Sequence, residues 1–192
     1  SSTQRDRSVS APPFVAVSHN RASVAPRSTT ISDCALTVLN AEETQDRQRW
    51  SYLIFSDELQ RWSSRAALDR AELFRRMVFN ALVTNNDDHP RNHALIAHSA
   101  EWRLSPAYDI TPAPLHSHER DLAMTCGLAA GRRATKANLL SGSLRFGLTA
   151  EEAANIIDRM RTFVAATWES AILANGGSQA DCEAVRPAFD IP

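Results

Sequence analysis

Glycine and lysine are nearly absent from the first two thirds of this 192-residue chain. The six glycines begin at Gly127, and the single lysine is Lys136. A glycine-rich loop that cradles phosphates with backbone N–H groups is therefore excluded before Gly127, and a phosphate-binding lysine is excluded before Lys136. An arginine could supply the charge there, but its planar guanidinium does not reproduce the geometry of an ammonium group.

Cysteines and long hydrophobic runs are also scarce. Cys34, Cys126 and Cys182 are far apart and form no Cys-x-x-Cys pair, so they indicate neither a disulfide framework nor a zinc knuckle. We expect buried, inert thiols in a reducing cytoplasm. No stretch is long enough to span a bilayer, and residues 14–17 are too short for the core of a secretory signal. The sequence therefore predicts a cytoplasmic protein without a membrane partner.

The charge is almost balanced, with 21 basic residues, 22 acidic residues and a formal net charge of −1. This balance gives no electrostatic reason to expect nucleic acid, so we predict no direct nucleic-acid partner. Hydrophobic residues make up 43% of the chain, enough for one core, and we expect one domain over residues 31–192. Residues 1–30 combine Ser, Thr and Arg with interrupting prolines, which indicates a disordered or atypical leader.

Hydrophobic periodicity predicts two long helices, at about residues 69–83 and 150–174. Asp69 and Glu72 have capping-box spacing in the first, and Thr149 and Glu152 have it in the second. The expected apolar stripes are Phe74, Met77, Val78, Ala81 and Leu82 in the first helix, and Ala153, Ile156, Met160, Phe163, Val164 and Trp168 in the second. Shorter helical turns are expected over residues 34–40 and 51–59, with a polar loop between them.

The segment between the two long helices has a different pattern. Residues 84–92 are small and polar and include a proline, which predicts a loop. Residues 93–97 and 102–104 suit the two strands of a short hairpin, and residues 105–112 follow as an extended segment with two prolines. The expected fold is mainly α with one short β-hairpin.

The chemistry is concentrated in this loop, hairpin and extended segment. Phosphoryl transfer needs a carboxylate that orients the attacking hydroxyl and oxygen ligands that hold Mg²⁺ against the nucleotide phosphates. In the protein-kinase catalytic loop, H-R-D-L-x-x-x-N, the metal-binding Asn lies five residues after the catalytic Asp, and a second metal-binding Asp follows a short hairpin. Asn92 lies five residues after Asp87, and Asp109 follows the predicted hairpin. The order and the spacing both indicate a kinase.

The same residues resemble a known family, the C-terminal domain of HipA-like kinases. The resemblance extends from about Ala35 to about Trp168 and is carried by Phe79-Asn80, residues 85–93, residues 104–109 and Asp121-Leu122-Ala123-Met124. It implies the C-terminal lobe of a distant protein-kinase-like fold and a serine/threonine kinase that uses Mg²⁺ and ATP. Members are typically toxins of type II toxin–antitoxin modules, so the resemblance also implies a protein substrate with Ser or Thr and a helix-turn-helix antitoxin partner.

The resemblance assigns roles to particular residues. Asp87 takes the place of the catalytic base, and Asn92 and Asp109 take the places of the Mg²⁺ ligands. His89, Arg91 and Tyr108 fall where the family approaches ATP. For His89, a hydrogen bond to neighbouring backbone is an equally good interpretation. The chain departs from the family in its lack of an upstream phosphate clamp, so we expect a lobe without its N-terminal part and phosphate loop, incomplete or inactive when isolated.

Other interpretations remain open beside the kinase. The chain could be a catalytically dead remnant that binds an antitoxin, or a metal-dependent phosphohydrolase that gathers Asp87, Asp88 and Asp109 around two metals. A zinc site would use His89 and His93, with His98, His116 and His118 downstream, but Pro90 disfavours the helix that such spacing requires. A final group, Arg132, Arg133 and Lys136, could hold an acidic partner, although a solvated charged surface is the simpler interpretation.

Overall fold

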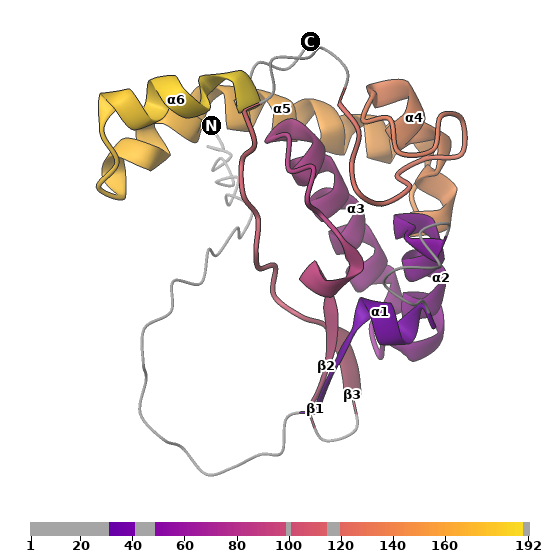
Figure 1. Cartoon of the computed structure of the whole chain (residues 1–192). Coiled ribbons are helices and arrows are strands. Elements are labelled where there is room, and N and C mark those ends of the chain that lie inside the picture. The colour runs from indigo at the N-terminus through magenta and orange to yellow at the C-terminus, as the bar shows by residue number, and fades with distance from the viewer. Residues whose placement is uncertain (1–30, 41–48, 99–100, 115–119, 190–192) are drawn as a thin grey trace, which may run out of the picture.

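A computed structural model describes residues 31–40, 49–98, 101–114 and 120–189 (Figure 1). The predicted leader at residues 1–30 lies outside the described residues, and that domain boundary stays a prediction. In chain order the elements are β1 (Ile31–Cys34), α1 (Ala35–Val38), α2 (Tyr52–Trp62), α3 (Ala66–Leu82), the 3₁₀ turn η2 (Pro90–Asn92), β2 (Ala94–His98), β3 (Glu101–Leu104), α4 (Lys136–Ser141), the 3₁₀ turn η3 (Ser143–Phe146), α5 (Ala150–Ala174) and α6 (Gln179–Phe189).

Helix α3 is the central element, with α2, α5 and the strands arranged around it (Figure 1). The predicted apolar stripe, from Phe74 to Leu82, is buried. On this face Phe74 meets Phe146 edge to face, with ring centroids 5.3 Å apart. Contacts of this kind stabilise a core beyond the area they bury. The predicted helix is therefore confirmed, although it begins three residues earlier than expected.

Helix α5 spans the predicted residues, Ala150–Ala174, and its capping box is present. The Thr149 hydroxyl accepts from the Glu152 N–H, while the Glu152 carboxylate accepts from the Thr149 N–H at 2.8 Å. Part of the expected stripe is wrong, because Phe163 is 51% exposed and Ile157, which was not expected, is buried. The fully buried residues, Ala153, Ile157 and Val164, form a narrow line along the helix, and Phe163 lies off that line.

The predicted hairpin is confirmed, with Leu95 opposite Leu104 and His98 opposite Glu101. A third strand, β1, was not predicted. It pairs antiparallel with the other side of β2, from Ile31 opposite Ala97 to Cys34 opposite Ala94, and gives the order β1-β2-β3. The fold is therefore mostly helical with a small three-stranded antiparallel sheet.

The cysteines are free thiols in different surroundings. Cys126 and Cys182 are buried, as expected, whereas Cys34 is only partly buried. Burial raises the pKa of Cys126 to about 12, so this thiol stays protonated and unreactive at neutral pH.

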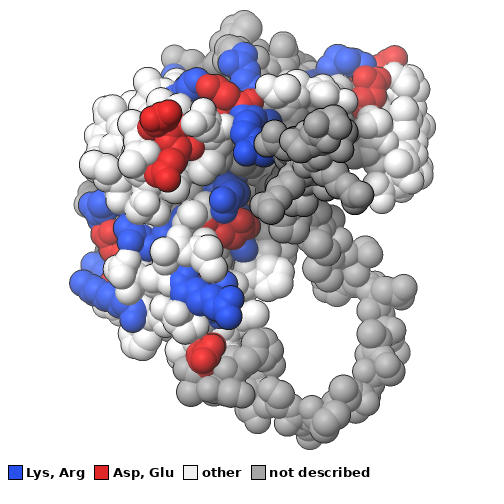
Figure 2. Space-filling model, turned by 180° about the vertical axis from the view of Figure 1, so that it is seen from behind, with Lys and Arg blue, Asp and Glu red and all other residues white. Residues whose placement is uncertain are grey.

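The surface carries both signs of charge. On the face shown in Figure 2, basic and acidic side chains alternate and neither forms a continuous field. Among the described helices, none combines the length and the apolar character needed to cross a membrane.

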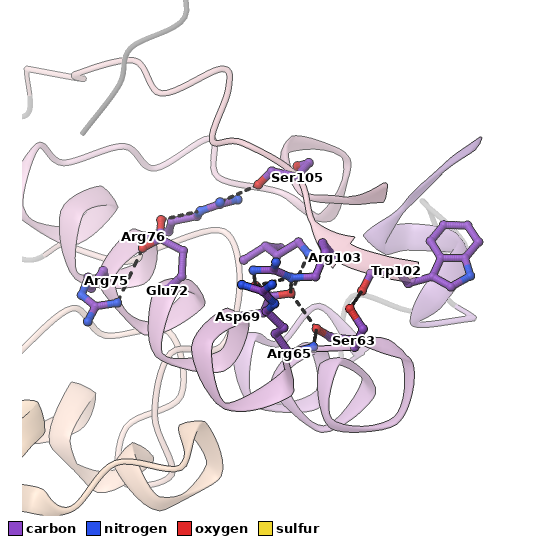
Figure 3. A network of polar contacts seen from close by, with 11 residues as sticks. Ser63, Arg65, Asp69, Glu72, Arg75, Arg76, Trp102, Arg103 and Ser105 are labelled. Atoms are coloured by element: carbon purple, nitrogen blue, oxygen red, sulfur yellow. Dashed lines mark hydrogen bonds and ion pairs between the residues drawn. The ribbon is translucent and has the colours of Figure 1, made fainter. Parts of the chain in front are cut away.

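The expected capping role of Asp69 is wrong, because Asp69 lies inside the first turn of α3 and Arg65 is the N-cap. Its carboxylate, in a residue only 3% exposed, instead binds β3 (Figure 3). It accepts a bidentate pair from Arg103, the backbone N–H of Leu104 at 2.9 Å and the Ser63 hydroxyl at 2.7 Å. Burial acts to raise the pKa of Asp69, but these hydrogen bonds outweigh it and the pKa is lowered.

The substitution Asp69→Asn is expected to lower the free energy of unfolding by about 2 kcal/mol at pH 7, because it removes the charge of a buried carboxylate that accepts several hydrogen bonds, although its partner Arg103 is partly exposed. Since the folded pKa lies below the unfolded value, this contribution is present above about pH 4 and is lost as the pH falls through the folded pKa. Urea denaturation at pH 7 and at lower pH measures both effects.

Asp158→Asn is the control, since Asp158 forms an exposed ion pair with Lys136. Its expected cost is below about 1 kcal/mol. Equal losses in the two variants would contradict a special role for Asp69.

Candidate active site

The predicted loop begins with a sharp turn at the end of α3. The N–H of Asn85 donates to the Asn80 carbonyl at 2.9 Å, and the N–H of Thr84 donates to the Ala81 carbonyl at 3.4 Å. These two bonds form the Schellman arrangement that ends many helices. Thr84 has a φ of 55°, in the left-handed region, where glycine is usual. The turn directs residues 85–92 back along α3 (Figure 1).

Two neighbouring aspartates in this loop have opposite environments. Asp87 is exposed, and its carbonyl accepts the N–H of His89 at 3.0 Å. Asp88 is 1% exposed. The turn therefore presents the carboxylate of Asp87 to solvent and directs that of Asp88 into the protein.

Asn92 joins the two halves of the predicted site. Its side-chain Nδ2 donates to the backbone carbonyl of Asp87 at 3.2 Å and to that of Asp109 at 3.5 Å. The structure thus brings together Asp87, Asn92 and Asp109, the three residues expected to supply the base and the Mg²⁺ ligands. Because the amide nitrogen binds these carbonyls, Oδ1 is the atom of Asn92 suited to a cation.

Asp109 is exposed and has a φ of 56°. Aspartate tolerates the left-handed region better than most residues, and such conformations concentrate at functional sites. The preceding residue, Tyr108, donates its hydroxyl to the Arg91 carbonyl at 2.6 Å and so joins this segment to the loop a second time. Burial, with a contribution from Cys34, raises the pKa of Tyr108, which keeps the phenol protonated as a donor.

Beneath the loop lies a buried polar network that the sequence did not reveal. Asp88 accepts hydrogen bonds from the Tyr52 hydroxyl and from His93 Nε2, the latter at 2.8 Å. The Tyr52 oxygen in turn accepts from Asn80 Nδ2 at 2.9 Å, and Asn80 Oδ1 accepts from Asn85 at 3.1 Å. The network thus connects α2, α3, the loop and the start of β2, and it satisfies a carboxylate that would be costly to bury alone.

Arg76 performs a similar task for the extended segment after β3. It donates to the Ser105 carbonyl at 2.5 Å and to Glu72 at 3.2 Å (Figure 3). Burial lowers the pKa of Arg76 and Glu72 opposes the shift, so the group remains a cation. A small crevice separates α3 and the loop from this segment; it is lined by Arg76, Asn80, Asp88, Asn92, His93, Ala107, Tyr108, Asp109 and Ile110.

A family model for the HipA-like C-terminal domain matches residues 14–168, which is most of the chain. This chain belongs to the HipA-like C-terminal domain family. Among solved structures it is similar to HipA of Shewanella oneidensis MR-1, determined with HipB and its operator DNA. That likeness has a TM-score of 0.66 at 14% identity and covers 82% of this chain but only 41% of the neighbour's. At this identity it supports the fold alone. No curated relative matches the chain.

Asn92 and Asp109 carry oxygen ligands of the kind that Mg²⁺ prefers, and Mg²⁺ stays the predicted metal. A carboxamide oxygen and a carboxylate are hard ligands, and Mg²⁺ typically takes one or two from the protein and the rest from water and phosphates. Among the described residues, no group of three or more His, Cys, Asp or Glu side chains could hold a metal. Asp88 is directed to Tyr52 and His93 and so does not join Asp87 and Asp109 in the carboxylate cluster of a hydrolase.

The nucleotide contacts expected of His89 and Arg91 stay predictions. Nδ1 of His89 is buried and has no hydrogen-bond partner within the described part of the chain, while its ring lies edge-on to Trp50 at 6.4 Å. Arg91 is exposed on the turn η2. His93, the second histidine of the alternative zinc site, forms a hydrogen bond with Asp88 through its Nε2. His116 and His118 lie outside the described residues.

Two residues of the basic cluster that was predicted as a solvated surface form ion pairs at the surface of the protein. Arg133 binds Asp121 at 2.7 Å, and Lys136 binds Asp158 at 2.5 Å. The charge of these two residues is therefore largely compensated within the chain, which weakens the case for an acidic partner there.

The chain's two tyrosines allow a matched test of the buried network. We expect Tyr52→Phe to lower the free energy of unfolding by about 2 kcal/mol, because Asp88 loses a donor and Asn80 an acceptor in the core. Tyr108→Phe should cost less than about 1 kcal/mol, since Tyr108 is 42% exposed and water can replace its hydroxyl. Urea denaturation compares the two, and a larger loss for Tyr108→Phe would contradict the network's importance.

Proposed function

We propose that this chain is the C-terminal lobe of a HipA-like serine/threonine kinase, the lobe that carries the catalytic loop. Such a kinase transfers a phosphoryl group from Mg·ATP to a protein hydroxyl. One observation carries the proposal: Asn92 bridges the backbones of Asp87 and Asp109, so that a candidate base and two candidate metal ligands share one locus. Asp87 and Asp109 are exposed there, as groups that meet a substrate must be.

The roles follow from the chemistry of each side chain. Asp87 would accept a hydrogen bond from the attacking Ser or Thr hydroxyl and take its proton as the hydroxyl oxygen bonds to the γ-phosphorus of ATP. The bond between that phosphorus and the β,γ-bridging oxygen would break, and ADP would leave. Asn92 Oδ1 and the Asp109 carboxylate would hold Mg²⁺, which, when bound, neutralises charge on the phosphate oxygens. Tyr108, besides its proposed contact with ATP, would fix the spacing of the two segments through the Arg91 carbonyl.

ATP binding needs more than this locus. His89, Arg91 and Tyr108 are the proposed contacts on this chain, but positioning accounts for most of phosphoryl-transfer catalysis. Since no lysine precedes Lys136 and no glycine precedes Gly127, the clamp for the phosphates would come from elsewhere. The chain spans 41% of the Shewanella HipA chain, and the activity of a whole kinase is therefore a proposal about more than these residues.

The proposed biological setting is a toxin–antitoxin module in the cytoplasm. The Shewanella HipA structure includes HipB and operator DNA, which supports a helix-turn-helix antitoxin as the partner of this chain too. Direct contact with nucleic acid is not part of the proposal, because charges of both signs alternate on the face in Figure 2 and the net charge is −1.

A second candidate is a catalytically dead lobe that binds an antitoxin without turnover, and the HipB partner in the Shewanella HipA structure is equally compatible with it. A phosphohydrolase is less well supported, since the buried carboxylate of Asp88 is occupied by its hydrogen bonds with Tyr52 and His93.

Calorimetric titration with Mg·ATP tests the proposal. The wild-type chain should bind, and Asp109→Ala should weaken binding by about tenfold or more, because it removes a metal ligand. The control Asp121→Ala removes an exposed, ion-paired carboxylate outside the site and should bind as the wild type does.

Each other outcome has a definite meaning. Failure of the wild type to bind would contradict nucleotide use by this chain and favour the dead lobe. Equal binding by wild type and Asp109→Ala would contradict the assigned metal site. Mg²⁺-dependent phosphate release without any phosphorylated protein would favour the hydrolase.

A further inference from the structure

Helix α6 lies beyond residue 168, where the family match ends, yet its last turn contacts the start of the candidate catalytic loop. It runs beside α5, and its C-terminal end lies near the end of α3 (Figure 1). The last carbonyls of any helix lack partners within the helix and must find donors elsewhere.

In α6 those donors come from two distant segments. The Thr84 hydroxyl donates to the Ala188 carbonyl at 2.7 Å. Arg120 donates to the same carbonyl at 3.3 Å and to the Pro187 carbonyl at 3.2 Å. Thr84 is 3% exposed, and water cannot readily substitute for its bond. A cation at the C-terminal end of a helix is also electrostatically favourable.

The end of α6 is itself held against α5. The rings of Trp168 and Phe189 stack with centroids 4.5 Å apart and planes 10° apart. The guanidinium of Arg186 lies over the same indole, 5.3 Å from its centroid. These contacts with α5 hold the last turn of α6, and with it the Ala188 carbonyl that accepts the hydrogen bond from Thr84.

Thr84 needs such external support because its conformation is unfavourable. A β-branched residue at a φ of 55° is rare, and the position after a helix in this arrangement usually carries glycine. The Schellman bonds of this turn involve backbone atoms alone, and the Thr84 side chain adds a tertiary bond that stabilises the same geometry. The direction in which residues 85–87 leave α3 depends on it.

We propose that α6 positions the catalytic loop and that Thr84 is the positioning residue through which it acts. The bond to Ala188 holds Thr84 in the left-handed conformation, and this directs Asp87 outward and Asp88 inward. The consequence for phosphoryl transfer rests on the proposed function, whereas the effect on the loop does not.

Hydrogen–deuterium exchange read by mass spectrometry tests the proposal on the full chain. Thr84→Val removes the hydroxyl and keeps the branched shape, so the amides of residues 85–92 should exchange about fivefold faster. Phe189→Ala, which loosens the last turn of α6, should accelerate the same amides. Thr84→Ser keeps the hydroxyl and should restore wild-type exchange.

The matched control is Thr162→Val, because the Thr162 hydroxyl donates to the Asp158 carbonyl on the exposed surface of α5. It should leave the loop unchanged. Wild-type exchange of residues 85–92 in both Thr84→Val and Phe189→Ala would overturn the proposal, as would equal acceleration throughout α3 and α5.

Mg·ATP titration of the same variants separates the two proposals. Faster loop exchange in Thr84→Val, together with failure of the wild-type chain itself to bind Mg·ATP, would support the role of α6 and contradict the kinase. Unchanged loop exchange in Thr84→Val, together with binding of Mg·ATP by the wild-type chain, would support the kinase and contradict the role of α6.

Discussion

The buried polar face of helix α3 is the constraint on which the rest of the structure depends. Asp69, Arg76 and Asn80 lie on one face of this helix at intervals of seven and four residues, beside its apolar stripe, and all three are buried. Buried polar groups must be satisfied, and each of these binds a different segment: Asp69 holds β3, Arg76 holds the segment after β3, and Asn80 holds Tyr52 and the loop. One helix thereby fixes both halves of the candidate site.

In this arrangement the residues that support the backbone of the site differ, with one exception, from those that would take part in the reaction. The residues that fix the backbone, Asp88 and Asn92 among them, are buried, and those that would meet a substrate, Asp87 and Asp109, are exposed. Asn92 belongs to both groups, because its nitrogen binds two carbonyls while its oxygen can face a cation. Hydrogen bonds within the chain thus hold the backbone of the site without a ligand, and catalysis by positioning requires such support.

The features predictable from sequence were local ones. The α5 capping box, the stripe of α3, the hairpin and the spacing of Asp87 and Asn92 are each encoded within a few residues. The missed features join distant segments: β1 depends on β2, Asp69 finds Arg103 instead of capping its helix, and Thr84 binds a carbonyl 104 residues away. Polar residues at 69, 76 and 80 on one helix face were the available signal, but their partners could not be read from periodicity.

Asp87, Asn92 and Asp109 are proposed to form one site for the metal and the nucleotide. Nuclear magnetic resonance with Mn²⁺·ATP tests it most directly, because the paramagnetic ion broadens the signals of nearby amides and leaves distant ones sharp. At substoichiometric Mn²⁺·ATP, the amide signals of these three residues should broaden first, while the amide signals of α5 and α6 should stay sharp. Broadening that begins at other acidic residues, such as Glu151 and Glu152, with these three unaffected, would contradict it.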